Sequence, residues 1–266
     1  MDKIENIEVY NSGMAKSMED KLFFLPIIGN EIGSFTDFGC ADGTLLKIIS
    51  GILPECKLRG IDMDSRMLRL AEENVPNAEL FLSDTPIDCD CDDKSVLNLS
   101  SVLHEVNSYS EDEEAFWDCI RNGGYSYITI RDMIYNEAEN EESKKYNLGE
   151  MSSEELICEQ LNWKKEGRLT TKKMLKEFES IWGSVNLKKN LMHYLLKYRY
   201  VQNWQREVHE NYLGYSTDDI IKNMGDNYRL IYRKDYILPF LYNKVNEDFG
   251  IQIDTPTHTN LIFKRR

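Results

Sequence analysis

The chain has 266 residues, 41% of them hydrophobic, and a formal net charge of −14. This length accommodates one large domain, or one domain with an inserted lobe. The acidic balance argues against a surface built for nonspecific binding of nucleic acid. No apolar run approaches the roughly 20 residues of a membrane span, and the first residues lack a signal-peptide core, so we expect a cytoplasmic protein.

Six cysteines are scattered along the chain. Cys89 and Cys91 lie close together among aspartates, but no second pair stands at metal-ligand spacing. We therefore expect free thiols, and no metal site is predicted.

Strand and helix signals alternate in the first half of the chain. A helical lead-in occupies the first thirty or so residues, and apolar runs then predict strands at 34–38, 57–62, 79–82, 95–100 and 125–131. Helices are expected between these strands at 44–50, 65–73 and about 112–122. This alternation predicts a parallel sheet that is covered on both faces.

The pattern changes after Met133. Helical periodicity dominates the following ninety or so residues, with candidate helices at 153–161, 170–182, 188–200, 202–212 and 216–224. Two late strands, at 228–238 and 261–264, are then expected on either side of a helix at 241–249.

The turn between the first strand and the first helix is the most informative segment. It reads Asp37-Phe38-Gly39-Cys40-Ala41-Asp42-Gly43, and the second strand ends in Asp62. The glycines let the backbone pass close under a ligand, and Asp62 can accept both hydroxyls of a ribose. The turn lacks the last glycine of the dinucleotide pattern, and Asp42 has the wrong charge to face a phosphate. An acid-flanked turn suits a cofactor that has a cationic end and no phosphate.

Together, the turn, helix, second strand and terminal acid resemble the first motif of class I S-adenosylmethionine (SAM) dependent methyltransferases. The resemblance covers roughly residues 34–134 and implies that SAM is the cofactor. It also implies a Rossmann-like, mostly parallel seven-stranded α/β sheet with helices on both faces, closed at one edge by the two late strands. Residues 1–134 and 225–266 would form this domain, and 135–224 would be a helical insertion after the fifth strand that serves as a substrate lid.

The resemblance further implies a set of cofactor contacts at the ends of the first four strands and in the lead-in: Tyr10, Asp37, Gly39, Cys40, Ala41, Gly43, Asp62, Met63, Asp84 and Ser100. Asp37 and the two glycines would cradle the methionine end of SAM, Met63 would pack on the adenine, and Asp84 would receive the adenine amino group. Two alternatives remain open, a solvated loop position for Asp84 and a helix-packing role for Tyr10.

His104 and Glu105 follow the fourth strand, where open α/β sheets bind their ligands. His104 has the pKa range of a general base that takes a proton from a hydroxyl or an amine. The alternative is a histidine that only shapes the pocket. Glu105 is a second candidate, as a base or as a substrate anchor.

Three further residues are candidates for substrate binding. Arg131 ends the fifth strand and could clamp a phosphate or carboxylate, or form an internal ion pair. Tyr198 and Trp204 lie where aromatic and basic residues alternate, as in proteins that stack bases. The same helical spacing also fits an ordinary buried stripe.

Charge is unevenly distributed. Residues 160–206 contain eleven Lys/Arg and three acids, a net of +8, so the remainder carries −22.

We predict a SAM-dependent methyltransferase that moves the methyl group by in-line displacement to a small polar acceptor. Three alternatives stay open: an RNA or nucleotide methyltransferase that uses the basic lobe, a silent SAM-binding partner protein, and a sulfonium-using enzyme that transfers no methyl. The acceptor atom and the oligomeric state do not follow from the sequence.

Overall fold

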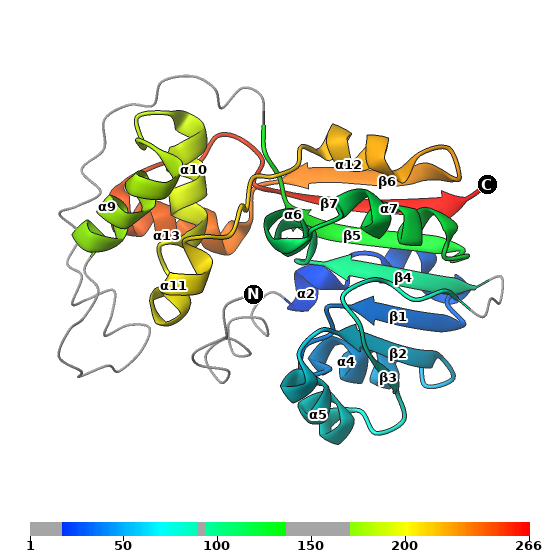
Figure 1. Cartoon of the computed structure of the whole chain (residues 1–266). Helices are drawn as coiled ribbons and strands as arrows, with labels where there is room; N and C mark the ends of the chain where they lie inside the picture. Colours follow the sequence, from blue (N-terminus) through cyan, green and yellow to red (C-terminus); the bar gives the residue numbers. More distant parts are fainter. Residues whose placement is uncertain (1–17, 90–93, 137–170) are drawn as a thin grey trace. The chain divides into compact units, whose positions relative to one another are not determined.

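The computed structural model describes residues 18–89, 94–136 and 171–266 (Figure 1). The described residues form two compact units. Among the described residues, the sheet unit contains Met18–Asp132, Thr217–Asp235 and Thr259–Arg266, and the helical unit contains the segments within Met133–Ser216 and Tyr236–His258. The predicted division into 1–134 with 225–266 and 135–224 differs from these units, because the segment 236–258 groups with the helical unit and helix 217–224 with the sheet unit.

Seven strands form one sheet in the order β3-β2-β1-β4-β5-β7-β6. Their bounds are β1 Ser34–Phe38, β2 Lys57–Asp62, β3 Glu79–Leu82, β4 Ser95–Ser100, β5 Tyr127–Met133, β6 Tyr228–Tyr236 and β7 His258–Arg265. Strands β1 to β5 pair in parallel. The mostly parallel seven-stranded sheet is thus confirmed.

Strand β7 runs against its neighbours, as two pairs of backbone hydrogen bonds show. Arg265 N bonds Ser126 O just before β5, and Ile134 N bonds Thr257 O just after it. On the other side, the carbonyls of Asn227 and Tyr236, at the two ends of β6, accept from Arg266 and Thr257 respectively. The two late strands therefore close the edge of the sheet as an antiparallel pair.

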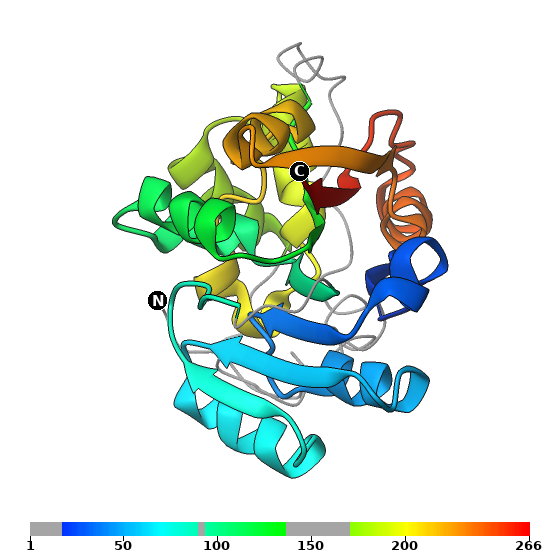
Figure 2. The same ribbon diagram turned by 90° about the vertical axis from the view of Figure 1, so that its right-hand side faces the viewer.

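Helices cover both faces of the sheet (Figure 2). Their bounds in the sheet unit are α2 Met18–Lys21, α3 Leu25–Ile28, α4 Thr44–Ile52, α5 Ser65–Asn74, α6 Leu103–Tyr109, α7 Glu113–Asn122 and α12 Thr217–Met224. The order reverses at β1, with β2 and β3 on one side and β4 and β5 on the other. Right-handed crossovers therefore place α4 and α5 on one face and α7 and α12 on the opposite face. All six residues of β4 are buried between these layers.

In the part of the chain that the structure describes, the helical unit contains α9 Thr171–Trp182, α10 Lys188–Lys197, α11 Trp204–Glu207 and α13 Pro239–Phe249. Its core is rich in aromatic side chains and includes Phe178, Tyr194, Tyr198 and Trp204. The predicted helix at 202–212 is wrong, since only a 3-10 turn (Val201–Asn203) and the single turn of α11 form there. The candidate helix at 153–161 lies outside the described residues. None of the helices in the described ranges has the length and hydropathy needed to cross a bilayer.

Candidate cofactor and active site

The glycine turn after β1 requires its glycines. Gly39 and Gly43 have φ angles of 76° and 75°, a region that side chains disfavour. A Cβ atom at Gly43 would lie 3.1 Å from the Cα and Cβ of Ala71 on α5. The N–H groups of Gly39 and Cys40 both donate to Ile61 O on the adjacent strand, at 2.8 and 3.0 Å. These two bonds hold the turn against the end of β2. The absence of a side chain at Gly43 lets the backbone of the turn pack closely against α5.

Asp62 joins this turn to the end of β2. Its Oδ2 accepts from Ala41 N at 2.9 Å, and its Oδ1 accepts from Asp64 N at 2.8 Å. Burial raises the pKa of Asp62, and the backbone N–H groups oppose that rise. A carboxylate has about four acceptor positions, so two remain for a ligand's hydroxyls. Met63, which follows, is 52% exposed, so its side chain is available to a flat ligand.

Asp37 belongs to a polar ladder that crosses three strands. Its Oδ1 accepts from Asn98 Nδ2 at 2.7 Å, and Asn98 Oδ1 accepts from Thr129 Oγ1 at 2.8 Å. The three residues stand directly opposite one another in β1, β4 and β5. Burial raises the pKa of Asp37 to about 6, while the Asn98 bond and the charge of Lys21 lower it. Asn98 and Thr129 were not among the predicted site residues, although polar residues inside two apolar strands were a usable signal.

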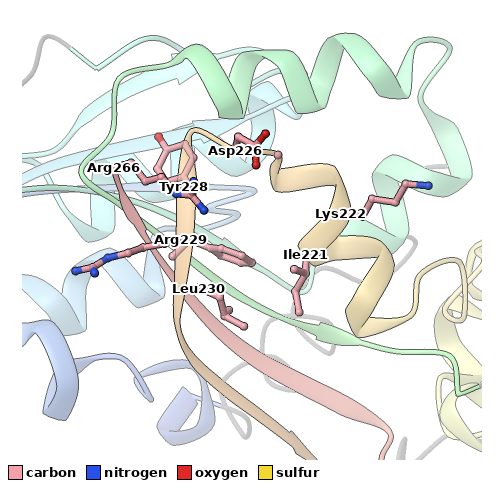
Figure 3. Close-up of a pocket in the computed structure, with 9 residues that line it drawn as sticks. Ile221, Lys222, Asp226, Tyr228, Arg229, Leu230 and Arg266 are labelled. Carbon is pink, nitrogen blue, oxygen red and sulfur yellow. The ribbon is translucent and has the colours of Figure 1, made fainter.

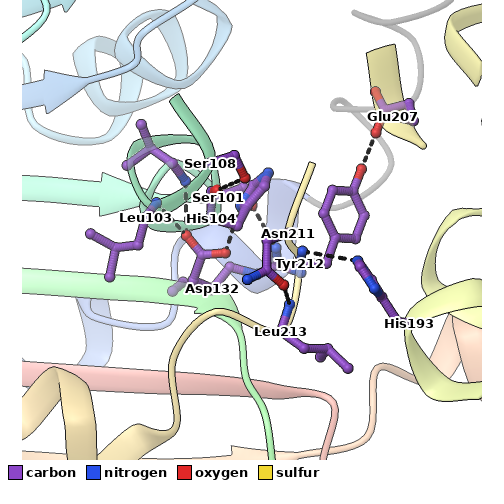
Figure 4. A network of polar contacts seen from close by, with 12 residues as sticks. Ser101, Leu103, His104, Ser108, Asp132, His193, Glu207, Asn211, Tyr212 and Leu213 are labelled. Atoms are coloured by element: carbon purple, nitrogen blue, oxygen red, sulfur yellow. Dashed lines mark hydrogen bonds and ion pairs between the residues drawn. The ribbon is translucent and has the colours of Figure 1, made fainter. Parts of the chain in front are cut away.

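His104 is paired with Asp132, as the left side of Figure 4 shows. Its Nδ1 lies 2.8 Å from Asp132 Oδ1, and both side chains are buried. Asp132 Oδ2 accepts from Val102 N at 2.9 Å and from Leu103 N at 2.7 Å, at the start of α6. Since an ionised carboxylate only accepts, Nδ1 of His104 carries the proton in this contact. The contact therefore fixes the orientation of the imidazole ring.

Arg131 is engaged inside the sheet unit. Its Nε donates to Asp20 Oδ2 at 2.8 Å and its Nη1 to Ser101 Oγ at 2.7 Å, and the side chain is buried. This geometry supports the internal ion pair, the alternative to the predicted substrate clamp, because the guanidinium neutralises a carboxylate of its own chain. The bond also fixes Ser101, a non-glycine residue with φ of 59°, in the turn that precedes His104.

The other predicted residues of the sheet unit are placed as follows. Ser100 Oγ is buried at the end of β4 without a hydrogen-bond partner among the described residues. Glu105 is half-buried in the first turn of α6, and its charge contributes to the raised pKa of Asp62. Asp84 is exposed and follows the end of β3. Cys40 is buried in the glycine turn, and this burial raises the pKa of its thiol. Tyr10 lies outside the described residues.

Tyr198 and Trp204 are corrected from substrate contacts to core residues of the helical unit. Tyr198 is fully buried and donates to Asp248 Oδ2 at 2.6 Å. Trp204 is buried as well, and its Nε1 donates to Glu177 Oε2 at 2.9 Å. Their helical spacing therefore reflects the buried stripe.

A second buried polar network lies in the helical unit (Figure 4, right). Tyr212 donates to Glu207, and His193 Nε2 lies 3.2 Å from Tyr212 N. Lys197 Nζ donates to the carbonyls of Glu207 and Glu210. Burial, with the charge of Lys197, holds the pKa of His193 well below its usual range. The network's polar groups are matched to one another, as a structural role requires.

Three basic residues of the predicted lobe, 160–206, form ion pairs within the helical unit. Lys188, Arg199 and Arg206 pair with Asp254, Asp248 and Glu210, all of which lie outside that range. The net of +8 therefore overstates the positive charge that the lobe can present to a phosphate backbone.

A hollow of about 490 Å³ lies elsewhere in the sheet unit, between α12 and the strands β6 and β7 (Figure 3). It adjoins the start of β6 and the last residues of β7, which neighbour the amino end of β5. Lys222 and Arg229 point away from each other, so their charges do not converge on one ligand position. It is therefore separate from the His104 region, at the carboxyl end of β4.

Comparisons with known proteins identify the fold. No protein-family model and no curated protein matches the sequence. Among solved structures, the chain is similar to the PH0226 protein from Pyrococcus horikoshii OT3, with a TM-score of 0.51, 7% identity, and coverage of 99% of this chain and 95% of that one. It is also similar to a candidate O-methyltransferase from Nostoc punctiforme, with a TM-score of 0.51, 10% identity, and coverage of 97% and 60%. The plantazolicin methyltransferase BpumL in complex with a substrate analogue and SAH (S-adenosylhomocysteine) has a TM-score of 0.47 and 11% identity, with coverage of 94% and 83%. The fold is the Rossmann-like fold of class I methyltransferases.

Proposed function

We propose that this protein is a SAM-dependent methyltransferase that methylates a hydroxyl or an amine of a small polar acceptor. The observation that carries the proposal is the His104–Asp132 pair, 2.8 Å apart. It lies at the carboxyl ends of β4 and β5, on the side of the sheet where the glycine turn follows β1 and Asp62 ends β2. Methyl acceptors of this kind must lose a proton, and we assign its removal to Nε2 of His104.

The residues around the turn fit SAM on three counts. Gly39 and Gly43, with φ of 76° and 75°, leave the turn without a side chain at two positions. Asp37 supplies negative charge for a cationic methionine end, and Asp62 has spare acceptor positions for ribose hydroxyls. SAM supplies an activated methyl group on a sulfonium, and the protein must position the acceptor in line with it.

The contribution of the chain's own residues is then proton transfer and orientation. Nε2 of His104 takes the acceptor's proton as its oxygen or nitrogen attacks. Asp132 keeps the imidazole in the tautomer with a proton on Nδ1 and stabilises the imidazolium that results. The Arg131–Ser101 bond holds the turn that carries His104 toward the site.

Cofactor binding tests the first half of the proposal. Calorimetry should give a Kd for SAH on the order of 1–100 μM. Asp62→Ala should weaken binding strongly, because two ribose hydroxyls lose their acceptor and the turn loses its bond to Ala41. Glu72→Ala, which removes an exposed carboxylate from nearby α5, is the matched control and should bind normally. Tight binding of NAD without binding of SAH would overturn the proposal.

Turnover tests the second half. Metabolite extracts incubated with SAM labelled in its methyl group should yield a labelled small molecule. The internal pairing of the basic residues favours a small acceptor over RNA. Labelled RNA as the sole product would reverse that choice, and SAH binding without any turnover would favour the silent-binder alternative.

A further inference from the structure

Lys21 is a buried cation that the proposed chemistry does not use. It ends helix α2, and its side chain is only 5% exposed. The preceding residue, Asp20, accepts from Arg131 Nε at 2.8 Å, so the end of α2 lies beside the end of β5. The charges of Arg131, Asp37, Asp132 and Asp20 all act on the Lys21 ammonium. No hydrogen bond or ion pair joins it to another residue in the described part of the chain.

Each acid near Lys21 already has a different partner. Asp20 accepts from Arg131 Nε, Asp37 accepts from Asn98, and Asp132 accepts from His104 and the first N–H groups of α6. A buried ammonium without a direct partner is unfavourable, and burial accordingly lowers the pKa of Lys21 to about 8. Such a group is retained most readily where a ligand provides the missing anion.

Asp37 and Lys21 together form a complementary pair of charges. Both are buried, both act on each other electrostatically, and no direct ion pair joins them. The α-amino acid end of SAM is a zwitterion that carries an ammonium and a carboxylate on one carbon. The carboxylate of Asp37 complements the ammonium of this group, and the ammonium of Lys21 complements its carboxylate.

We propose that Lys21 binds the carboxylate of the methionyl group of SAM and of its product, an inference that rests on the proposed function. Arg131 is another buried cation near this position, and Asp20 balances its charge at 2.8 Å. Lys21 has no such ion pair among the described residues, so we assign Lys21 to the carboxylate and Asp37 to the ammonium.

The test compares ligands that differ in this group. SAH carries the amino acid end, its decarboxylated analogue lacks only the carboxylate, and methylthioadenosine lacks the whole amino acid end. Lys21→Met should weaken SAH binding about 10–100-fold, as expected for loss of a charge-assisted bond, and leave the other two ligands unchanged. Lys47→Met, which removes an exposed lysine from α4, is the matched control and should bind all three ligands as the wild type does.

The outcomes separate the two proposals. Equal SAH affinity in Lys21→Met and wild type would overturn the carboxylate assignment and leave the methyltransferase proposal intact. Equal weakening of all three ligands would also overturn it, because the lysine would then support only the fold of the site. Wild-type protein that binds none of the three would instead overturn the proposed function itself.

Discussion

Lys21→Met should make the protein more stable, although it removes a residue from the candidate cofactor site. Burial and the charge of Arg131 lower the pKa of Lys21 from its ordinary value of 10.5 to about 8, so the folded state binds this proton less tightly than the unfolded state. Each tenfold difference in proton affinity is worth ~1.4 kcal/mol, so the charged lysine destabilises the folded protein by about 3 kcal/mol at pH 7. Methionine has a similar length and carries no charge, so it removes this penalty.

The assay is thermal unfolding of the ligand-free protein at several pH values. At pH 7 the variant should melt roughly 6–12 °C above the wild type. The penalty is present in full below about pH 8 and disappears above pH 10.5, so the difference should shrink as the pH rises through that interval. Lys47→Met, the exposed control, should change the melting temperature little. A variant that is less stable than wild type at pH 7 would refute the reasoning, since it would mean that Lys21 has a partner in the folded chain.

Three further outcomes follow from the site. SAH affinity of the wild type should fall above pH 8, where Lys21 loses its proton, and titration calorimetry of Lys21→Met should show a weaker fall. Asp132→Asn should lower turnover roughly 10²–10⁴-fold with SAH affinity unchanged, because an amide can still cap α6 but reverses the tautomer of His104, and normal turnover would refute the base assignment. Gly43→Ala should lower the free energy of unfolding by about 1–2 kcal/mol, since φ is 75° there. Gly51→Ala in α4, where a Cβ atom meets nothing within 4 Å, should instead be neutral or stabilising in the same denaturant titration.

The parallel half of the sheet was predictable because its signals are local. The runs that form β1 and β2, and the glycines between them, specify strand, turn and strand without reference to distant residues. Helix α6 was missed for the opposite reason. Its N-cap, Val102, has no capping side chain, and the cap comes from Asp132, thirty residues away in sequence.

The candidate site was predictable only in part, because the sequence gives the type and position of each residue but not its neighbours in the folded chain. Asp37, Asp62 and His104 follow from their positions at strand ends. Lys21 reads as an ordinary basic residue of a helical lead-in, and only tertiary structure reveals that it is buried near Asp37. Tyr198 shows the reverse error, since a pattern that resembles a binding surface proved to be core.

The ladder of Asp37, Asn98 and Thr129 also bears on how the strands find their alignment. β1, β4 and β5 are short, and apolar side chains alone would discriminate weakly between neighbouring alignments. A shift of β4 by one residue would place Leu97 or Leu99 beside Asp37 and leave a buried carboxylate without its donor. The polar residues of the ladder therefore also destabilise sheets with a shifted strand register. A variant that loses the ladder is expected to populate more than one register.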